Sequence, residues 1–167
     1  MKGNRLYYVL PLLILWCGCK SISERAAEYN SRIVSVHQAA VMRLAALDSA
    51  LMMDGASDSL LMSKLHELDS VVESGLKQSE EVGPFEGDVK LQMELFDWLT
   101  THRQFLHNDY KKLIQIKLLP LDSVQVSDSD SSLVIQERIR AQSRVAQDAL
   151  VNAQNEFGRL YHLKFEQ

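Results

Sequence analysis

Apolar side chains recur along this chain at alternating spacings of three and four residues, the pattern of amphipathic α-helices. The longest series spans residues 22–51. Ser21 and Glu24, three positions apart, match the capping box that starts a helix, and Gly55 supplies a residue that tolerates a helix C-cap. The pattern therefore predicts a first helix from about Ser21 to about Asp54.

Three more helices are expected. The second covers about residues 57–81. The third is expected to begin at Pro84, because proline is favoured at the first helical position, and to end at about residue 119, before Pro120. Its apolar positions spread over more than half of its circumference, so it should contact more than one neighbour. The fourth covers about residues 133–163.

Together these elements predict an all-α fold, an antiparallel up-down-up-down four-helix bundle in a single domain. Gly55, Gly83 and Pro120 interrupt the chain at intervals that return it on itself, and no segment alternates with a period of two. Residues 121–132, rich in Ser and Asp, are expected to form the one long loop. The side chains expected to be buried are Ile33, Leu44, Leu68, Phe96, Leu99, Leu106, Ile139 and Phe157.

The first twenty residues follow a different pattern. Lys2 and Arg5 precede an apolar run at residues 6–16, and the small-residue sequence Cys17-Gly18-Cys19 ends it. A spanning helix needs roughly 20 apolar residues, so this shorter run predicts a secretory signal peptide at residues 1–18.

This segment resembles the signal peptides of bacterial lipoproteins, in which a small residue precedes a cysteine that receives the lipid. By that resemblance Cys19 begins the mature chain, residues 19–167, and carries the lipid that anchors it in a membrane. Lys20 stands where aspartate would favour retention at the inner membrane, so the resemblance implies the outer membrane. The alternative is an ordinary cleaved signal whose cysteines are incidental.

Charge and cysteine content narrow the classes of partner. Removing residues 1–18 takes away Lys2, Arg5 and no acidic residue, so 16 basic and 22 acidic side chains remain, a net charge of -6. Without clustered Lys and Arg, a nucleic-acid partner is not expected. Both cysteines lie in the signal region, so no disulfide is expected and packing alone must stabilise the domain.

No motif predicts a catalytic residue, a cofactor or a metal site. The acidic run with Asp122, Asp128 and Asp130 lacks the glycine and the closing glutamate of an EF-hand, so a solvated linker is expected. The histidines do not share a helix face at the spacing of bundle metal sites, although ligation between helices stays open. They are His37, His66, His102, His107 and His162.

Several side chains of the third helix invite two interpretations. His102 is expected to be a hydrogen-bonded core or boundary residue. Gln92, Arg103 and Tyr110 lie within about 20° of one another on an ideal helix. They form either a small buried polar network or a boundary stripe from which Arg103 reaches solvent. Scattered methionines are expected to fill the core rather than to bind haem; they include Met42, Met62 and Met93.

Two segments resemble the terminal helices of small helical-bundle surface lipoproteins of Gram-negative bacteria. They are residues 27–34, AEYNSRIV, and residues 153–163, AQNEFGRLYHL. That family has no assigned activity, so the resemblance implies a fold and a location and transfers no functional residue. Gly158 departs from the pattern and should weaken the end of the fourth helix by roughly 1 kcal/mol relative to alanine.

These observations predict a lipid-anchored cell-envelope lipoprotein, not an enzyme, that acts as a binding or structural module. Its expected contacts are the membrane, through the lipid, and an envelope protein. The loops at residues 54–57 and 121–132, at the end of the bundle away from the anchor, are the expected contact surface. The alternative is a periplasmic carrier or sensor that holds a small apolar ligand or haem between its helices, which the wide aromatic arc of the third helix suggests.

Overall fold

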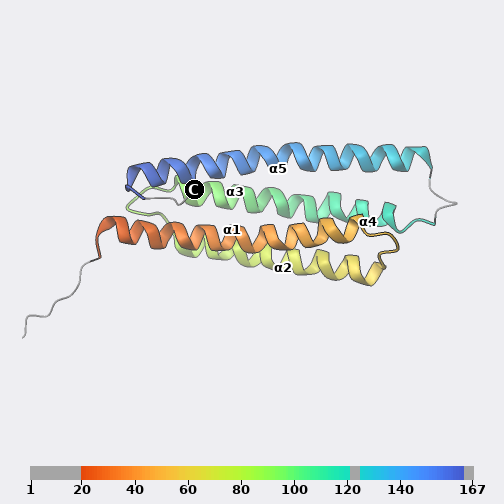
Figure 1. The fold of residues 1–167 in the computed structure, drawn as a ribbon, viewed down its shortest axis with the longest axis horizontal. Helices are drawn as coiled ribbons and strands as arrows, with labels where there is room; N and C mark the ends of the chain where they lie inside the picture. Colours follow the sequence, from red (N-terminus) through yellow and green to blue (C-terminus); the bar gives the residue numbers. More distant parts are fainter. Residues whose placement is uncertain (1–19, 121–124, 164–167) are drawn as a thin grey trace, which may run out of the picture.

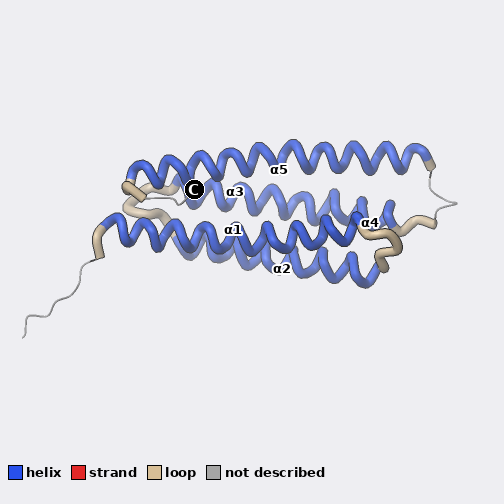
Figure 2. Tube along the Cα trace, in the orientation of Figure 1, coloured by secondary structure: helices blue, strands red, loops and turns tan. Residues whose placement is uncertain are grey.

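The protein is described by a computed structural model in which residues 20–120 and 125–163 are placed. Their helices are α1 (Ile22–Met52), α2 (Asp58–Val82), α3 (Lys90–Gln104), η1 (Phe105–Tyr110), α4 (Lys111–Lys117) and α5 (Val126–Leu160). The segments α3, η1 and α4 continue one another as a single rod, and consecutive rods run in opposite directions (Figure 1). Short loops join α1 to α2 and α2 to α3, at opposite ends of the bundle (Figure 2). The predicted all-α bundle is confirmed.

The first two helices begin where their capping residues predict. The Glu24 amide donates to Ser21 Oγ at 3.2 Å, and the Ser21 amide donates to Glu24 Oε2 at 2.8 Å, which completes the capping box of α1. Ser57 Oγ accepts from the Leu60 amide at the start of α2. Gly83, with a φ of 64°, ends α2 in the left-handed region that glycine tolerates.

The third rod begins at Lys90 and not at Pro84, so the predicted start is wrong. Residues 85–88 form a tight turn, in which the amides of Phe85 and Asp88 each donate to the other's carbonyl oxygen. Phe85 is buried, and its ring lies 5.2 Å from Tyr29 and 5.4 Å from Phe157. Burying this ring between α1 and α5 fixes the turn and delays the helix.

A π-helical segment, η1, interrupts the third rod at Phe105–Tyr110. The wider turn changes the angle between successive side chains, so residues beyond it no longer follow the phase of an α-helix. Asp109 and Tyr110 are both buried here, beside Phe105 and Leu106. The Asp109 carboxylate accepts a charge-assisted hydrogen bond from Arg138 of α5, which pairs the otherwise buried acid.

The fourth rod begins at Val126, so the predicted long loop at residues 121–132 is wrong for 126–132. The amide of Gln125 donates to Asp128 Oδ2 at 3.0 Å, a capping box that uses the serine- and aspartate-rich composition to start α5. Asp130 is exposed on this helix, and Asp122 lies outside the described residues. The predicted solvated linker is therefore helical over most of its length. Gly158 lies within α5, and its carbonyl oxygen accepts from the Leu163 amide just beyond the helix end.

The core runs along the centre of the bundle. Ile33, Leu68, Leu99, Leu106, Ile139 and Phe157 are buried as predicted. Leu44 and Phe96 are only half-buried against this core, which corrects the prediction for both. Packing is close at Gly75 of α2, where an added Cβ would lie 3.1 Å from Val36 and 3.2 Å from Leu99.

The methionines do not play their predicted role. Met42, Met62 and Met93, expected in the core, are all exposed on helix surfaces. No helix in the described part of the chain has an apolar stretch long enough to cross a membrane.

Candidate functional site

A cleft of about 670 Å³ lies near the end of the bundle where α1 ends. It lies between the C-terminal part of α1, the η1–α4 segment and the first half of α5, at the right-hand end in Figure 1. This volume is within the range of about 300–1,000 Å³ for small-molecule sites. Its apolar walls are formed by Leu44, Leu51, Met52, Leu113, Ile116, Leu133 and Ile139.

Three of the α5 side chains that line the cleft are small. Ser129, Ser132 and Ser143 line the α5 side, where larger apolar residues would fill part of the space. Their hydroxyl groups also give the hollow polar contacts.

One acid lies within the cleft and is already engaged. The Tyr110 hydroxyl donates to Asp48 Oδ1 at 2.9 Å. Burial raises the pKa of Asp48, an effect that the Tyr110 hydrogen bond partly opposes. Burial, together with the nearby Asp48 carboxylate, raises the pKa of Tyr110, so its hydroxyl stays protonated and remains a donor. The pair holds α1 against η1.

Two cations also line the cleft, Lys117 at the end of α4 and Arg140 on α5. A second hollow, of about 410 Å³ between α3 and α5, has the opposite character, because Glu94 and Asp97 line it together with apolar and amide side chains. The two hollows therefore differ in charge, and only the larger one presents basic groups among its described lining residues.

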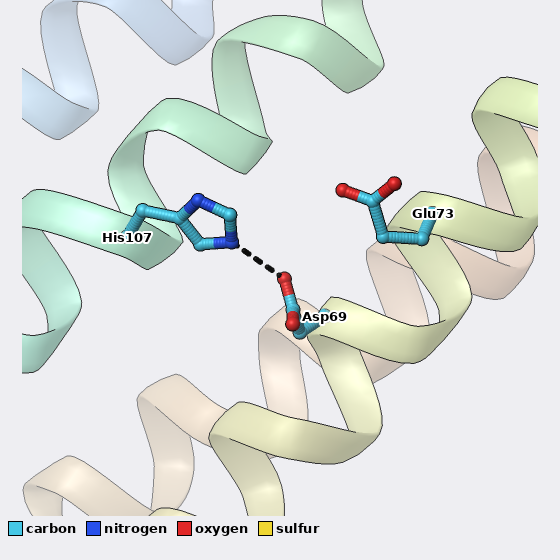
Figure 3. Close-up of side chains that lie close together, drawn as sticks. All are labelled: Asp69, Glu73 and His107. Atoms are coloured by element: carbon cyan, nitrogen blue, oxygen red, sulfur yellow. Dashed lines mark hydrogen bonds and ion pairs between the residues drawn. The ribbon is translucent and has the colours of Figure 1, made fainter.

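A separate cluster joins α2 to the third rod. Asp69 and Glu73, one turn apart on α2, face His107 of η1 (Figure 3). His107 Nε2 lies 3.0 Å from Asp69 Oδ1, and one ligand atom of each residue lies within 4.8 Å of the others. This spacing would suit a divalent cation. However, Arg103 Nη1 already lies 3.5 Å from Glu73 Oε1, so the group is more simply a network of complementary charges between helices.

The sequence missed this cluster because its members come from different helices. The spacing of four between Asp69 and Glu73 shows in the sequence that they share a helix face. The position of His107 beside them depends on the π-helical segment, which the sequence does not reveal. Motifs within one helix carry no signal for such a contact.

His102 is a hydrogen-bonded histidine of the core, one of the two positions, core or boundary, that the sequence predicts. It is 2% exposed, its ring stacks on Trp98 at 3.8 Å, and Nδ1 lies 2.8 Å from the Trp98 carbonyl oxygen. Burial lowers its pKa. His37 approaches the same Trp98 ring edge-on at 4.7 Å and shares a hydrogen bond with Gln147 Oε1; burial lowers its pKa too. His66 and His162 are exposed.

Ser143 Oγ lies 3.4 Å from His102 Nε2, an arrangement with the outline of a serine–histidine pair. A nucleophile of this kind also needs donors for the oxyanion. Ser143 lies in the middle of α5, where the neighbouring amides are used by the helix itself. The contact is therefore better explained as hydrogen bonding of a buried imidazole.

The side chains of Gln92, Arg103 and Tyr110 were predicted to share one helix face, but in the structure they contact different partners. Gln92 donates to the Ser79 carbonyl oxygen, Arg103 pairs with Glu73, and Tyr110 donates to Asp48. The first two contacts are with α2 and the third with α1, because η1 changes the helical phase before Tyr110. Only Tyr110 of these three belongs to the cleft, so the common buried network, one of the two expected interpretations, does not form. The Arg103 side chain is partly exposed to solvent, as the boundary-stripe interpretation expected.

Comparisons with known proteins give no family for this chain, since no family model, no curated protein and no solved structure matches it. Cys19, the predicted lipid attachment site, lies outside the described residues.

Proposed function

We propose that this protein is a lipid-anchored lipoprotein of the cell envelope, placed in the outer membrane, which binds a small amphipathic molecule and performs no catalysis. The anchor is supported by the basic start, the apolar run and Cys19 of the sequence. The binding role is carried by one observation, the cleft between α1, α4 and α5.

Packing energetics favour a binding role over a purely structural one. Protein interiors are close-packed, and unfilled space costs stability because its lining atoms lose their contacts. Three serines line the α5 side of the cleft where larger side chains would close it. A bundle that served only as a spacer would have no use for this hollow.

The haem-binding form of the carrier hypothesis has less support. Met52 is among the described residues that line the cleft, but none of the five histidines is. An apolar ligand with a polar group fits this lining better, because it needs no axial ligand.

A second candidate function is contact with an envelope protein at the same end of the bundle. Met52, Met53 and Val126 expose 83%, 53% and 80% of their surface there. Placing a photo-crosslinking amino acid at Val126 in intact cells tests this idea, and one specific adduct, absent when the crosslinker replaces exposed Arg32 at the other end of α1, would support it.

The binding role is tested by filling the cleft. We would use the full-length chain with Cys19→Ser, which carries no lipid of its own, and titrate the neutral fluorescent probe N-phenyl-1-naphthylamine. Ser132→Trp places a large ring in the cleft and should abolish the probe signal. Ser127→Trp adds the same ring at an exposed position outside the lining and should leave it unchanged.

The outcome is decisive in either direction when both variants keep the melting temperature of the parent chain. Loss of binding in Ser132→Trp alone assigns the probe to the cleft. Equal binding by all three proteins would remove the cleft from consideration.

A further inference from the structure

The basic groups of the cleft identify the kind of ligand that it suits. Lys117 and Arg140 come from α4 and α5, the two segments that face each other across it. Among residues 20–120 and 125–163 neither cation forms an ion pair, whereas Arg25, Arg103 and Arg138 each pair with an acid. These two cations give an apolar hollow a positive edge in a chain whose net charge is -4.

Among the described lining residues, one acid faces these two cations. Asp48 Oδ1 already accepts a hydrogen bond from the Tyr110 hydroxyl, so part of its acceptor capacity is used within the protein. The hydroxyl groups of Ser129 and Ser132 can donate to an additional acceptor on the α5 side. The lining thus offers more donors and positive charge than acceptors.

The apolar part of the cleft limits the rest of the ligand. Leu44, Leu113, Ile116 and Ile139 come from three separate segments and surround a space of about 670 Å³. This space accommodates one flexible hydrocarbon chain, and the two chains of a phospholipid would exceed it. The start of α1, at Ile22, lies about 33 Å along the helix from Leu44, the first residue of α1 that lines the cleft, so a lipid carried just before α1 is not the expected occupant.

We propose that the cleft binds a single-chain fatty acid, with its hydrocarbon chain between α1, α4 and α5 and its carboxylate against Lys117 and Arg140. This inference rests on the binding function proposed above and names its ligand class. The carboxylate is the preferred headgroup because a guanidinium can bind both of its oxygens at once.

The test compares three molecules that share a sixteen-carbon chain. Palmitate, hexadecanol and hexadecyltrimethylammonium are titrated against the full-length Cys19→Ser chain, each below its micelle concentration, by displacement of N-phenyl-1-naphthylamine. Palmitate should bind about tenfold more tightly than hexadecanol, since a hydrogen bond to a charged group adds that much affinity. The cationic molecule should bind most weakly.

Matched variants show which side chains are responsible for the preference for palmitate over hexadecanol. Replacing both cations, with Lys117→Gln and Arg140→Gln, should reduce palmitate binding to the level of hexadecanol and leave hexadecanol unchanged. Lys112→Gln and Arg144→Gln remove the same charges from exposed positions of α4 and α5 outside the lining, and should change neither ligand.

Each contrary outcome is distinct. Equal affinity for palmitate and hexadecanol would overturn the headgroup assignment while leaving the cleft as a binding site. Preference for the ammonium compound would overturn it in favour of Asp48 as the selecting group. Tighter binding of a single-chain lysophosphatidate than of palmitate would overturn the carboxylate in favour of a phosphate. Failure of every molecule to bind would overturn this inference and the proposed function together.

Discussion

His102 is the clearest example of a residue whose surroundings set its chemistry. Its imidazole stacks on Trp98 and meets the Phe105 ring edge-on, and only 2% of the residue is exposed. Burial lowers the pKa of His102, and the nearby His37 lowers it further, so the folded protein holds the ring neutral. In the unfolded chain the ring titrates near its ordinary value of about 6.5.

We predict that this histidine makes the protein less stable in mild acid. Below about pH 6.5 the unfolded chain binds a proton that the folded protein excludes, so the free energy of unfolding should fall as the pH decreases towards the lowered folded pKa. Urea denaturation between pH 7.5 and 5.5 measures this slope. His102→Gln should reduce it, whereas His66→Gln, at an exposed position on α2, should leave it unchanged. An identical slope in the His102 variant would show that the ring does not resist protonation.

At the scale of the element, the third rod buries its two phenylalanine rings unequally. Phe105 begins η1 and is 3% exposed, while Phe96 lies earlier, in α3, and is only half-buried. An ideal α-helix predicted Phe96 as core. The structure assigns that role to Phe105.

Alanine substitutions should distinguish these two rings. Phe105→Ala removes a fully buried ring and should cost about 3 to 5 kcal/mol of unfolding free energy. Phe96→Ala loses partial burial only and should cost less than about 2 kcal/mol. Both are measured by urea denaturation at pH 7.5. Comparable losses for the two variants would contradict the difference in burial between the two rings.

The elements also show how far a hydrophobic pattern can predict a fold. Helices α1 and α2 were predictable because apolar spacing and capping residues agree, as at Ser21 and Glu24. The start of α5 was not predictable, because serine and aspartate have a low helix propensity and are typical of loops. At a helix N-terminus the same residues act as caps and complement the helix dipole, which is the role of Asp128.

Hydrophobic patterns along the sequence predict neither the cleft nor the turn before α3. Tyr110 lines the cleft from within η1, and Lys117 and Arg140 line it from helices that are distant in sequence. Phe85 stops the early start of α3 by packing on Tyr29 and Phe157, residues 56 and 72 positions away in the sequence. Contacts between elements decide all of these features, and a single sequence does not record them.

At the scale of the whole molecule, the proposed anchor and the cleft lie at opposite ends of the bundle. Helix α1 begins at Ile22, three residues after Cys19, and its other end contributes Leu51 and Met52 to the cleft. A bundle attached through Cys19 can therefore present the cleft away from the bilayer, by up to about 46 Å for the length of α1. This arrangement would leave the cleft open to ligands in the aqueous phase.

The anchor is tested by Cys19→Ser, with Cys17→Ser as the matched control. If lipid is attached at Cys19, each buried methylene contributes about 0.8 kcal/mol to membrane binding, so several acyl chains together hold the protein in the membrane fraction. Cys19→Ser should then be recovered as an unprocessed or soluble form after membrane flotation, with no lipid adduct by mass spectrometry. Cys17→Ser keeps Gly18 and Cys19 and should float like the parent chain. A Cys19→Ser protein that is fully processed and still floats would rule out Cys19 as the anchor, and with it the orientation that points the cleft away from the membrane.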